Sequence, residues 1–304
     1  MILLFALLGL VVGVLVNQLA SELPAVAASR LIDQADGTDV NRTSSDPPDA
    51  ADTDPDRLRS AASNARGRRI KVRGRRIKAR GRRIKVRPHC PHCGQNRPWW
   101  QWLTLSAYLG GRGRCPACQS PISLRHPLVE IGLAVAFGYL WATLGPSIKL
   151  APYLLYTAIL TLILITDIER RLILNVVTYP AMLLAFVFSF LTPGMTWWSA
   201  LLGGAIGFAF FFGAALVGNA AFGSGAMGGG DVKLAAFVGL ITGFPLVIEA
   251  LLLTILVGAA ISVLLLVLRV RTMRDYIPYG PFLVAGAMIT LLWGHPIAAW
   301  FIYR

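Results

Sequence analysis

The chain has 304 residues, of which 55% are hydrophobic and 14% are charged, and its mean hydropathy is +0.60. Soluble domains carry about 25% charged residues, so this composition excludes an ordinary soluble globular protein. The formal net charge of +14 is concentrated locally, because thirteen basic residues lie between Arg66 and Arg87 and eight aspartates between Asp33 and Asp56.

Long apolar runs recur along the chain, and a helix of about 20 apolar residues crosses roughly 30 Å of hydrocarbon. The sequence therefore predicts an all-α polytopic membrane protein with about eight transmembrane helices. The first run has no basic segment before it and no clear cleavage site, so we interpret it as a retained span, with a cleaved signal peptide as the alternative. The runs cover 2–20, 128–145, 150–166, 174–192, 197–217, 232–245, 247–268 and 281–301.

Residues 25–87 differ from the apolar runs on either side. Their first part is rich in Asp, Ala, Ser, Thr and Pro, and their second part repeats RGRRIKV, RGRRIKA and RGRRIKV. Each repeat has a Gly, four cations and one or two apolar residues, which excludes a coiled coil. We expect a disordered insertion, acidic and then basic, that acts as a tether and can touch anionic membrane lipids. Nucleic-acid binding is disfavoured because no aromatic residues interleave the cations.

Residues 88–127 form a small polar module that contains all four cysteines. Two Cys-x-x-Cys units, separated by 21 residues, can offer four thiolates to a tetrahedral zinc ion: Cys90, Cys93, Cys115 and Cys118. Four protein ligands leave no open position for water, so such a zinc ion would be structural. Disulfides or redox pairs are the alternative, and His89 and His92 are interpreted as neighbours of the site.

The positions of Lys and Arg predict the orientation in the membrane. With eight spans, the basic arm, the cysteine module, Arg170, Arg171 and Lys233 all fall on the same face, together with the cations of 269–274. This face should be the cytoplasmic one.

Two aspartates stand at predicted span ends on that face. Asp167 follows the run that ends Leu162-Ile-Leu-Ile-Thr, and Asp231 follows Met227-Gly-Gly-Gly. Two carboxylates in one site can share one proton, so that one member takes a proton from water and the other polarises a carbonyl group. The alternatives are that Asp231 is a helix N-cap and that Asp167 pairs with a neighbouring arginine.

The glycines before Asp231 disfavour a helix at that point and permit positive φ. Without side chains, Gly228 and Gly230 would let an extended peptide approach the backbone closely. Unwound backbone at membrane depth is tolerated where it lines a wet cavity, which is what peptide hydrolysis requires.

These residues resemble the type IV prepilin peptidase family. Gly228-Gly-Gly-Asp231 with Lys233 and Leu234 is similar to its G-x-G-D-x-K-L motif, and Asp167 with Asn175 to its first aspartate and downstream helix start. His126-Pro-Leu-Val-Glu130 and Ile277-Pro-Tyr-Gly-Pro-Phe282 resemble two further family segments. The paired cysteine knuckles are typical of its longer branch.

The resemblance implies a multi-pass aspartic endopeptidase of the bacterial inner membrane, with Asp167 and Asp231 as its catalytic residues. It implies cytoplasmic cleavage of prepilins or pseudopilins after a leader Gly. Many long-branch members also methylate the new N-terminus with S-adenosylmethionine. The long insertion departs from the family, and no Rossmann-type glycine loop is present, so the sequence assigns no residues to methylation.

The predicted organisation has four parts: a first transmembrane helix (1–24), a disordered cytoplasmic insertion (25–87), a zinc-binding module (88–127) and a seven-helix protease domain (128–304). Two other functions fit parts of the pattern. A presenilin-like protease shares Gly-x-Gly-Asp, but the cysteine knuckles are not expected in it. A non-enzymatic zinc-bearing scaffold of a pilus or secretion machine would not need the aspartates. The sequence does not predict an oligomeric state.

Overall fold

The computed structural model describes residues 1–42, 90, 92–96, 98, 101–111, 113–222, 228–268 and 279–302. The chain divides into two compact units, one formed by Met1–Pro24 with Lys85–Arg304 and the other by Ala25–Ile84. The three basic repeats lie outside the described residues, as does most of the predicted disordered insertion.

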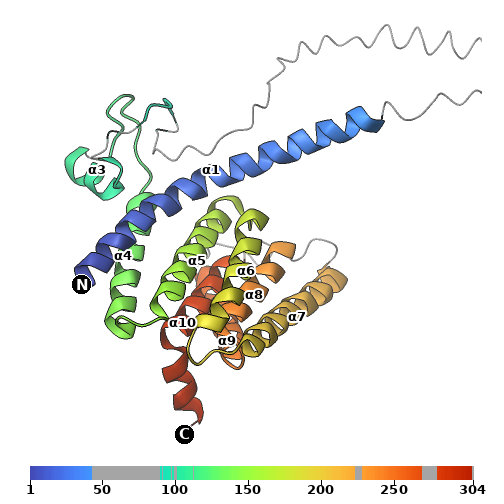
Figure 1. Ribbon diagram of the computed structural model, residues 1–304. Helices are drawn as coiled ribbons and strands as arrows, with labels where there is room; N and C mark the ends of the chain where they lie inside the picture. Colours follow the sequence, from blue (N-terminus) through green and yellow to red (C-terminus); the bar gives the residue numbers. More distant parts are fainter. Residues whose placement is uncertain are drawn as a thin grey trace, which may run out of the picture. The chain divides into compact units, whose positions relative to one another are not determined.

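Every regular element of the described residues is a helix, which confirms the predicted all-α class (Figure 1). The chain contains α1 (Ile2–Arg42), α3 (Thr104–Gly111), α4 (Arg125–Leu144), α5 (Leu150–Arg170), α6 (Asn175–Leu191), α7 (Trp197–Phe222), α8 (Gly229–Thr242), α9 (Leu246–Val267) and α10 (Gly280–Ile302). A helix lies at each of the eight predicted apolar runs.

Five of these helices are long and apolar enough to cross a membrane, and they lie at Ile2–Ala28, Arg125–Leu144, Leu150–Arg170, Trp197–Ala220 and Leu246–Val267. Asn175–Leu191 and Gly280–Gly294 are shorter apolar helices. The chain is therefore a helical membrane protein, but the predicted count of eight spans is not confirmed. The 14-residue α8 is short because Gly228 and Gly243 flank it.

The first helix is longer than predicted. We expected disorder to begin at residue 25, but α1 continues through Pro24 to Arg42. The sequence directly after Pro24 contains three alanines in four residues, Ala25-Val-Ala-Ala28. Alanine has the highest helix propensity of all residues, so this stretch favours continuation of the helix.

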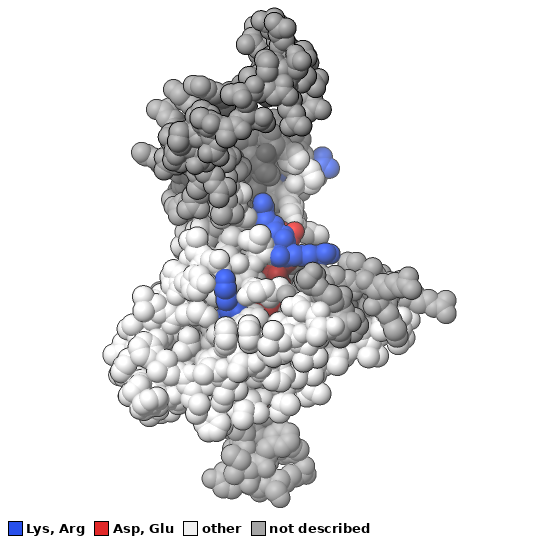
Figure 2. Space-filling view, turned by 90° about the vertical axis from the view of Figure 1, so that its right-hand side faces the viewer, with Lys and Arg blue, Asp and Glu red and all other residues white. Residues whose placement is uncertain are grey.

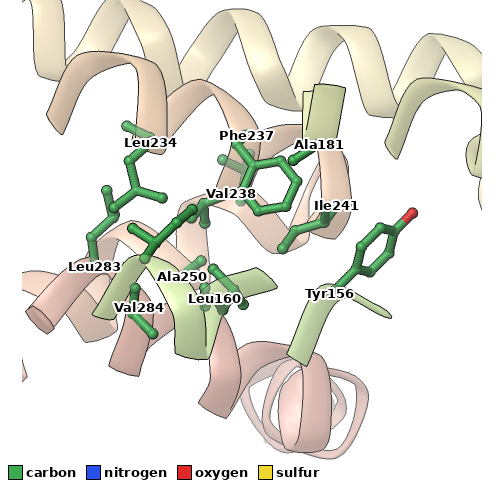
Figure 3. Close-up of a cluster of buried hydrophobic side chains, with 14 of the residues drawn as sticks. Tyr156, Leu160, Ala181, Leu234, Phe237, Val238, Ile241, Ala250, Leu283 and Val284 are labelled. Atoms are coloured by element: carbon green, nitrogen blue, oxygen red, sulfur yellow. The ribbon is translucent and has the colours of Figure 1, made fainter. Parts of the chain in front are cut away.

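The main core surrounds α8, which packs against α6, α7, α9 and α10 (Figure 1). Leu234, Phe237 and Val238 of α8 are fully buried, and they meet Leu160 of α5 and Leu283 of α10 (Figure 3). A short helix enclosed on several sides is held mainly by protein contacts. This enclosure fixes the first turn of α8, where Asp231 lies.

Glycines let α7 and α8 approach at backbone distance. A Cβ atom at Gly203 would overlap the carbonyl oxygen of Gly239, and one at Gly207 would overlap that of Ala235. Small residues one turn apart are the usual means of close helix packing in membranes. The contact holds α8 firmly against α7.

The cysteine-containing module is tied to α4 by a buried carboxylate. Glu130 is fully buried, and its Oε1 atom accepts hydrogen bonds from the backbone N–H (3.1 Å) and hydroxyl (2.7 Å) of Thr104. Its Oε2 atom accepts a third from the Leu105 N–H at 3.2 Å. These N–H groups open α3, where a negative charge is favoured. Glu130 thereby joins α3 to a membrane helix.

Candidate active site

Asp167 lies in the last turn of α5, and its side chain is 4% exposed. The helix ends one turn later because Arg171 adopts the left-handed conformation, with φ 51° and ψ 42°. The Arg171 N–H donates to the Asp167 carbonyl oxygen at 2.8 Å. This cap ends α5 within one turn of the aspartate, and the chain then leads into α6.

Asp231 is the third residue of α8, and its side chain is 6% exposed. The N-cap of α8 is Gly228, in an extended conformation, so the alternative that Asp231 is itself the N-cap is wrong. A Cβ atom at Gly230 would lie 3.0 Å from Cβ of Ile173, on the α5–α6 connection. Glycine at this position therefore lets α8 begin close to the end of α5.

The two aspartates line one pocket of about 220 Å³, together with the predicted glycines and the α5–α6 connection. Its lining residues are Asp167, Arg171, Leu172, Ile173, Gly228, Gly230 and Asp231. On this face, acidic side chains are recessed between basic ones (Figure 2). The structure thus brings together all four residues proposed for this site from the sequence.

Nearby cations have separate partners. Lys233 donates to Oδ1 of Asn175 at 3.0 Å, and its ammonium group lies 5.3 Å from the centre of the Tyr179 ring. Arg125 of α4 forms an ion pair with Glu169 of α5. The alternative that Asp167 pairs with a neighbouring arginine stays a prediction, and Arg171 lines the same pocket as Asp167.

One further residue contacts this site. Gly280, the first residue of α10, lies so close to Asp167 that a Cβ atom there would overlap Oδ2. That buried oxygen has no hydrogen-bond partner among the described residues. This glycine belongs to the segment Ile277-Pro-Tyr-Gly-Pro-Phe282, for which the sequence alone indicated no role. The glycine between Tyr279 and Pro281 could have suggested a close contact at this position. The sequence does not indicate that the contacting group is the Asp167 carboxylate.

The four cysteine sulfurs lie within 4.8 Å of one another, as a shared metal ion requires. The Cys90–Cys118 and Cys93–Cys115 sulfurs are 3.6 and 3.9 Å apart, much longer than a disulfide of about 2.05 Å. Both knuckles have the same backbone pattern: the first cysteine donates its N–H to the residue five positions on and accepts one from the residue four positions on. The module can therefore hold a metal ion.

The ionisation of the thiols supports this assignment. Burial disfavours the Cys90 thiolate, but hydrogen bonds from Ser120 and from backbone N–H groups of the first knuckle lower its pKa to about 5. Cys93 receives a backbone hydrogen bond from Gln95, yet burial and the other thiols raise its pKa to about 11. Four thiolates therefore require a cation among them, and a tetrahedral divalent ion fits this donor set.

Comparison with known proteins agrees with this arrangement. Residues 154–263 match the model described as Type IV leader peptidase family, and residues 7–144 match the Bacterial Peptidase A24 N-terminal domain. A prepilin leader peptidase/N-methyltransferase of Aeromonas hydrophila is 33% identical over 222 residues, or 71% of this chain and 74% of the relative. The chain belongs to the type IV leader peptidase family.

Other members of the type IV leader peptidase family show similar agreement. Proteins of the same name from Pseudomonas putida and Bacillus subtilis are 30% and 29% identical, covering 69% and 71% of this chain and 73% and 85% of the relatives. No solved structure matches the chain. The leader peptidase match contains both aspartates but ends before Gly280.

Proposed function

We propose that this chain is a membrane-embedded aspartic endopeptidase that removes the leader of type IV prepilins or pseudopilins after a Gly. Asp167 and Asp231 are its catalytic residues in this proposal. The observation that carries it is that both aspartates, buried and from different helices, line one pocket with Gly228 and Gly230. Membership of the leader peptidase family supports the same reaction.

The reaction requires one proton shared between the carboxylates. The ionised aspartate takes a proton from water, the water oxygen bonds to the scissile carbonyl carbon, and the protonated aspartate donates to the carbonyl oxygen. The tetrahedral intermediate then breaks its C–N bond as the amine nitrogen gains a proton. No covalent enzyme intermediate forms.

Substrate access depends on the glycines. An extended peptide can approach the pocket beside Gly228 and Gly230, because no side chain projects from either residue. We propose that the leader enters from the cytoplasmic face of the inner membrane, where Arg170, Arg171 and Lys233 would lie. This face would also contact membrane lipids.

We further propose that the four cysteines hold one structural zinc ion. Four thiolates complete a tetrahedral site, so the ion would stabilise the module and leave peptide hydrolysis to the aspartates. Because the Glu130 carboxylate of α4 accepts hydrogen bonds from α3, an ordered module would also hold α3 in place against α4.

A second activity is methylation of the new N-terminus with S-adenosylmethionine. It is favoured by the similarity of this chain to proteins named prepilin leader peptidase/N-methyltransferase. After cleavage, an added methyl group that appears only with S-adenosylmethionine would establish it. A product of unmodified mass under those conditions would exclude it.

The peptidase proposal is tested by cleavage of a purified prepilin-like substrate in detergent, with the cut site read by mass spectrometry. Wild type should cut after the leader Gly, whereas Asp167→Asn and Asp231→Asn should each be inactive while accumulating normally. Glu249→Gln is a matched control, because it removes a carboxylate of α9 that does not line the pocket.

The outcomes separate the competing functions. Normal cleavage by either Asn variant would overturn the dyad. Cleavage inside a span of an unrelated substrate, with prepilin intact, would favour a presenilin-like protease. Pilus or secretion assembly supported by both Asn variants would favour the scaffold.

A further inference from the structure

The side chain of Ser120 lies between the two cysteine knuckles. Its hydroxyl oxygen is 3.1 Å from the sulfur of Cys118, in its own knuckle, and 3.5 Å from the sulfur of Cys90, in the other. The two sulfurs are 3.6 Å apart, although the cysteines are separated by 28 positions in the sequence. One hydroxyl group therefore contacts a proposed metal ligand from each knuckle.

The corresponding residue of the first knuckle lacks this contact. The Ser120 carbonyl oxygen accepts the N–H of Cys115, five positions earlier, at 3.0 Å. In the same way, the Gln95 carbonyl oxygen accepts the N–H of Cys90 at 2.9 Å. Gln95 is exposed, and no hydrogen bond between its side chain and a sulfur occurs among the described residues. The contact with the sulfurs thus belongs to the serine hydroxyl and not to the repeated backbone pattern.

The backbone on both sides of Ser120 is held by hydrogen bonds. Arg114 and Pro121 form an isolated antiparallel bridge, and the Ile122 N–H donates to the Gly113 carbonyl oxygen at 2.8 Å. A side chain on such a backbone needs little rearrangement to meet its partner, which is the usual condition for a well-formed site. The hydroxyl is therefore placed beside the sulfurs by the fold of the module itself.

The chemistry of a metal-bound cysteine sets the direction of these hydrogen bonds. A thiolate ligand has no proton, so the Ser120 hydroxyl must be the donor and the sulfur the acceptor. The hydroxyl has a single proton and donates to one sulfur at a time, with Cys118 the nearer. Hydrogen bonds to an ionised acceptor are stronger than those between neutral groups. Partners of this kind also fix the orientation of metal ligands.

We propose that Ser120 is a positioning residue of the metal site, whose hydroxyl donates to the Cys118 thiolate and, in a second orientation, to the Cys90 thiolate. It thereby holds one ligand from each knuckle in place. This role rests on the proposed structural zinc ion. Ser120 makes no bond to the ion, because the four cysteines already complete a tetrahedral set.

The zinc affinity of the full chain in detergent tests this role, measured by competition with a chromophoric chelator. Ser120→Ala should raise the dissociation constant for zinc about tenfold or more, as loss of a hydrogen-bond partner of a metal ligand does. Ser120→Thr keeps the hydroxyl and should stay within roughly threefold of wild type. Gln95→Ala is the matched control and should stay within roughly twofold, because it shortens the residue at the corresponding place in the first knuckle.

A spectroscopic measurement separates the hydrogen bond from a general loosening of the module. Cobalt(II) in place of zinc gives a sulfur-to-cobalt charge-transfer absorption band. Loss of a hydrogen-bond donor makes the sulfur a better electron donor, so the band should move to longer wavelength in Ser120→Ala. It should stay in place in Ser120→Thr and Gln95→Ala. A module that was merely loosened would bind less cobalt without a shift of the band.

Four results would overturn this role. They are wild-type zinc affinity in Ser120→Ala, an equal loss of affinity in Ser120→Thr, an equal loss in Gln95→Ala, and an unshifted cobalt band in Ser120→Ala. A wild-type chain that took up neither zinc nor cobalt would overturn the proposed metal site and this role with it. A wild-type chain that bound zinc no more tightly than Ser120→Ala would overturn the role alone.

Discussion

Gly280 lies directly against the Oδ2 oxygen of Asp167, so the start of α10 forms one side of the site. The two residues come from helices far apart in the sequence. Their contact leaves no room for even one additional carbon atom. The position of the α5 carboxylate therefore depends on the C-terminal helix.

Gly280→Ala should lower cleavage activity by about tenfold or more, because the added methyl group displaces the Asp167 carboxylate or moves α10 away from it. The comparison is kcat for the prepilin-like peptide. Gly132→Ala is the matched control, since a Cβ atom there meets no atom within 4 Å. Full activity in Gly280→Ala would contradict the described contact.

Gly239→Ala should weaken the α7–α8 packing. Its Cβ atom would overlap the carbonyl oxygen of Gly203, and overpacking of this kind costs about 1–3 kcal/mol. The melting temperature in detergent should fall, and activity with it, because α8 carries Asp231. Gly213→Ala in α7, where a Cβ atom meets no neighbour, should be neutral. An unchanged melting temperature in Gly239→Ala would show that α7 and α8 are further apart.

Glu130→Gln should loosen the cysteine module from α4. Both oxygens of the Glu130 carboxylate accept hydrogen bonds, whereas a glutamine amide has only one acceptor oxygen. Loss of a buried charge-assisted hydrogen bond costs about 1–3 kcal/mol. Hydrogen exchange of the α3 amides should increase. Thr104→Val removes only the hydroxyl donor and should have a smaller effect. Equal exchange in Glu130→Gln and wild type would refute this link.

The purified chain should contain roughly one zinc ion, and the Cys93→Ser, Cys115→Ser double variant should contain none. Metal analysis by mass spectrometry provides the measurement. Zinc should also dissociate more readily at acidic pH, because protons compete with the metal for the thiolates. Wild-type protein that is folded and active without metal would count against a structural site.

The features that could be predicted from the sequence depend on composition and order along the chain. Apolar runs indicated eight helices, and the positions of Asp167 after one run and of Asp231 before another indicated that the two could lie close together. The α5–α6 connection then brings Ile173 against Gly230, a contact that requires the folded chain. The pairing was predictable because Asp167 lies at the end of one predicted span and Asp231 at the start of another, on the same predicted face.

The features that could not be predicted depend on backbone conformation and on long-range contacts. The sequence around Arg171 does not indicate a left-handed backbone conformation, because arginine is a common residue in helices. Gly280 was visible as part of a motif, but its neighbour is set by the packing of α10 against α5. The continuation of α1 past Pro24 was also missed, because proline and the polar residues that follow suggested an end.

The contact between Gly280 and Asp167 also sets the length of the smallest working fragment. A chain that stopped at residue 263 would contain the whole matched peptidase segment and both aspartates. It would nevertheless lack Gly280, which contacts the Asp167 carboxylate. Truncations intended to isolate the protease should therefore extend into α10, and C-terminal fusions should leave the start of that helix unaltered.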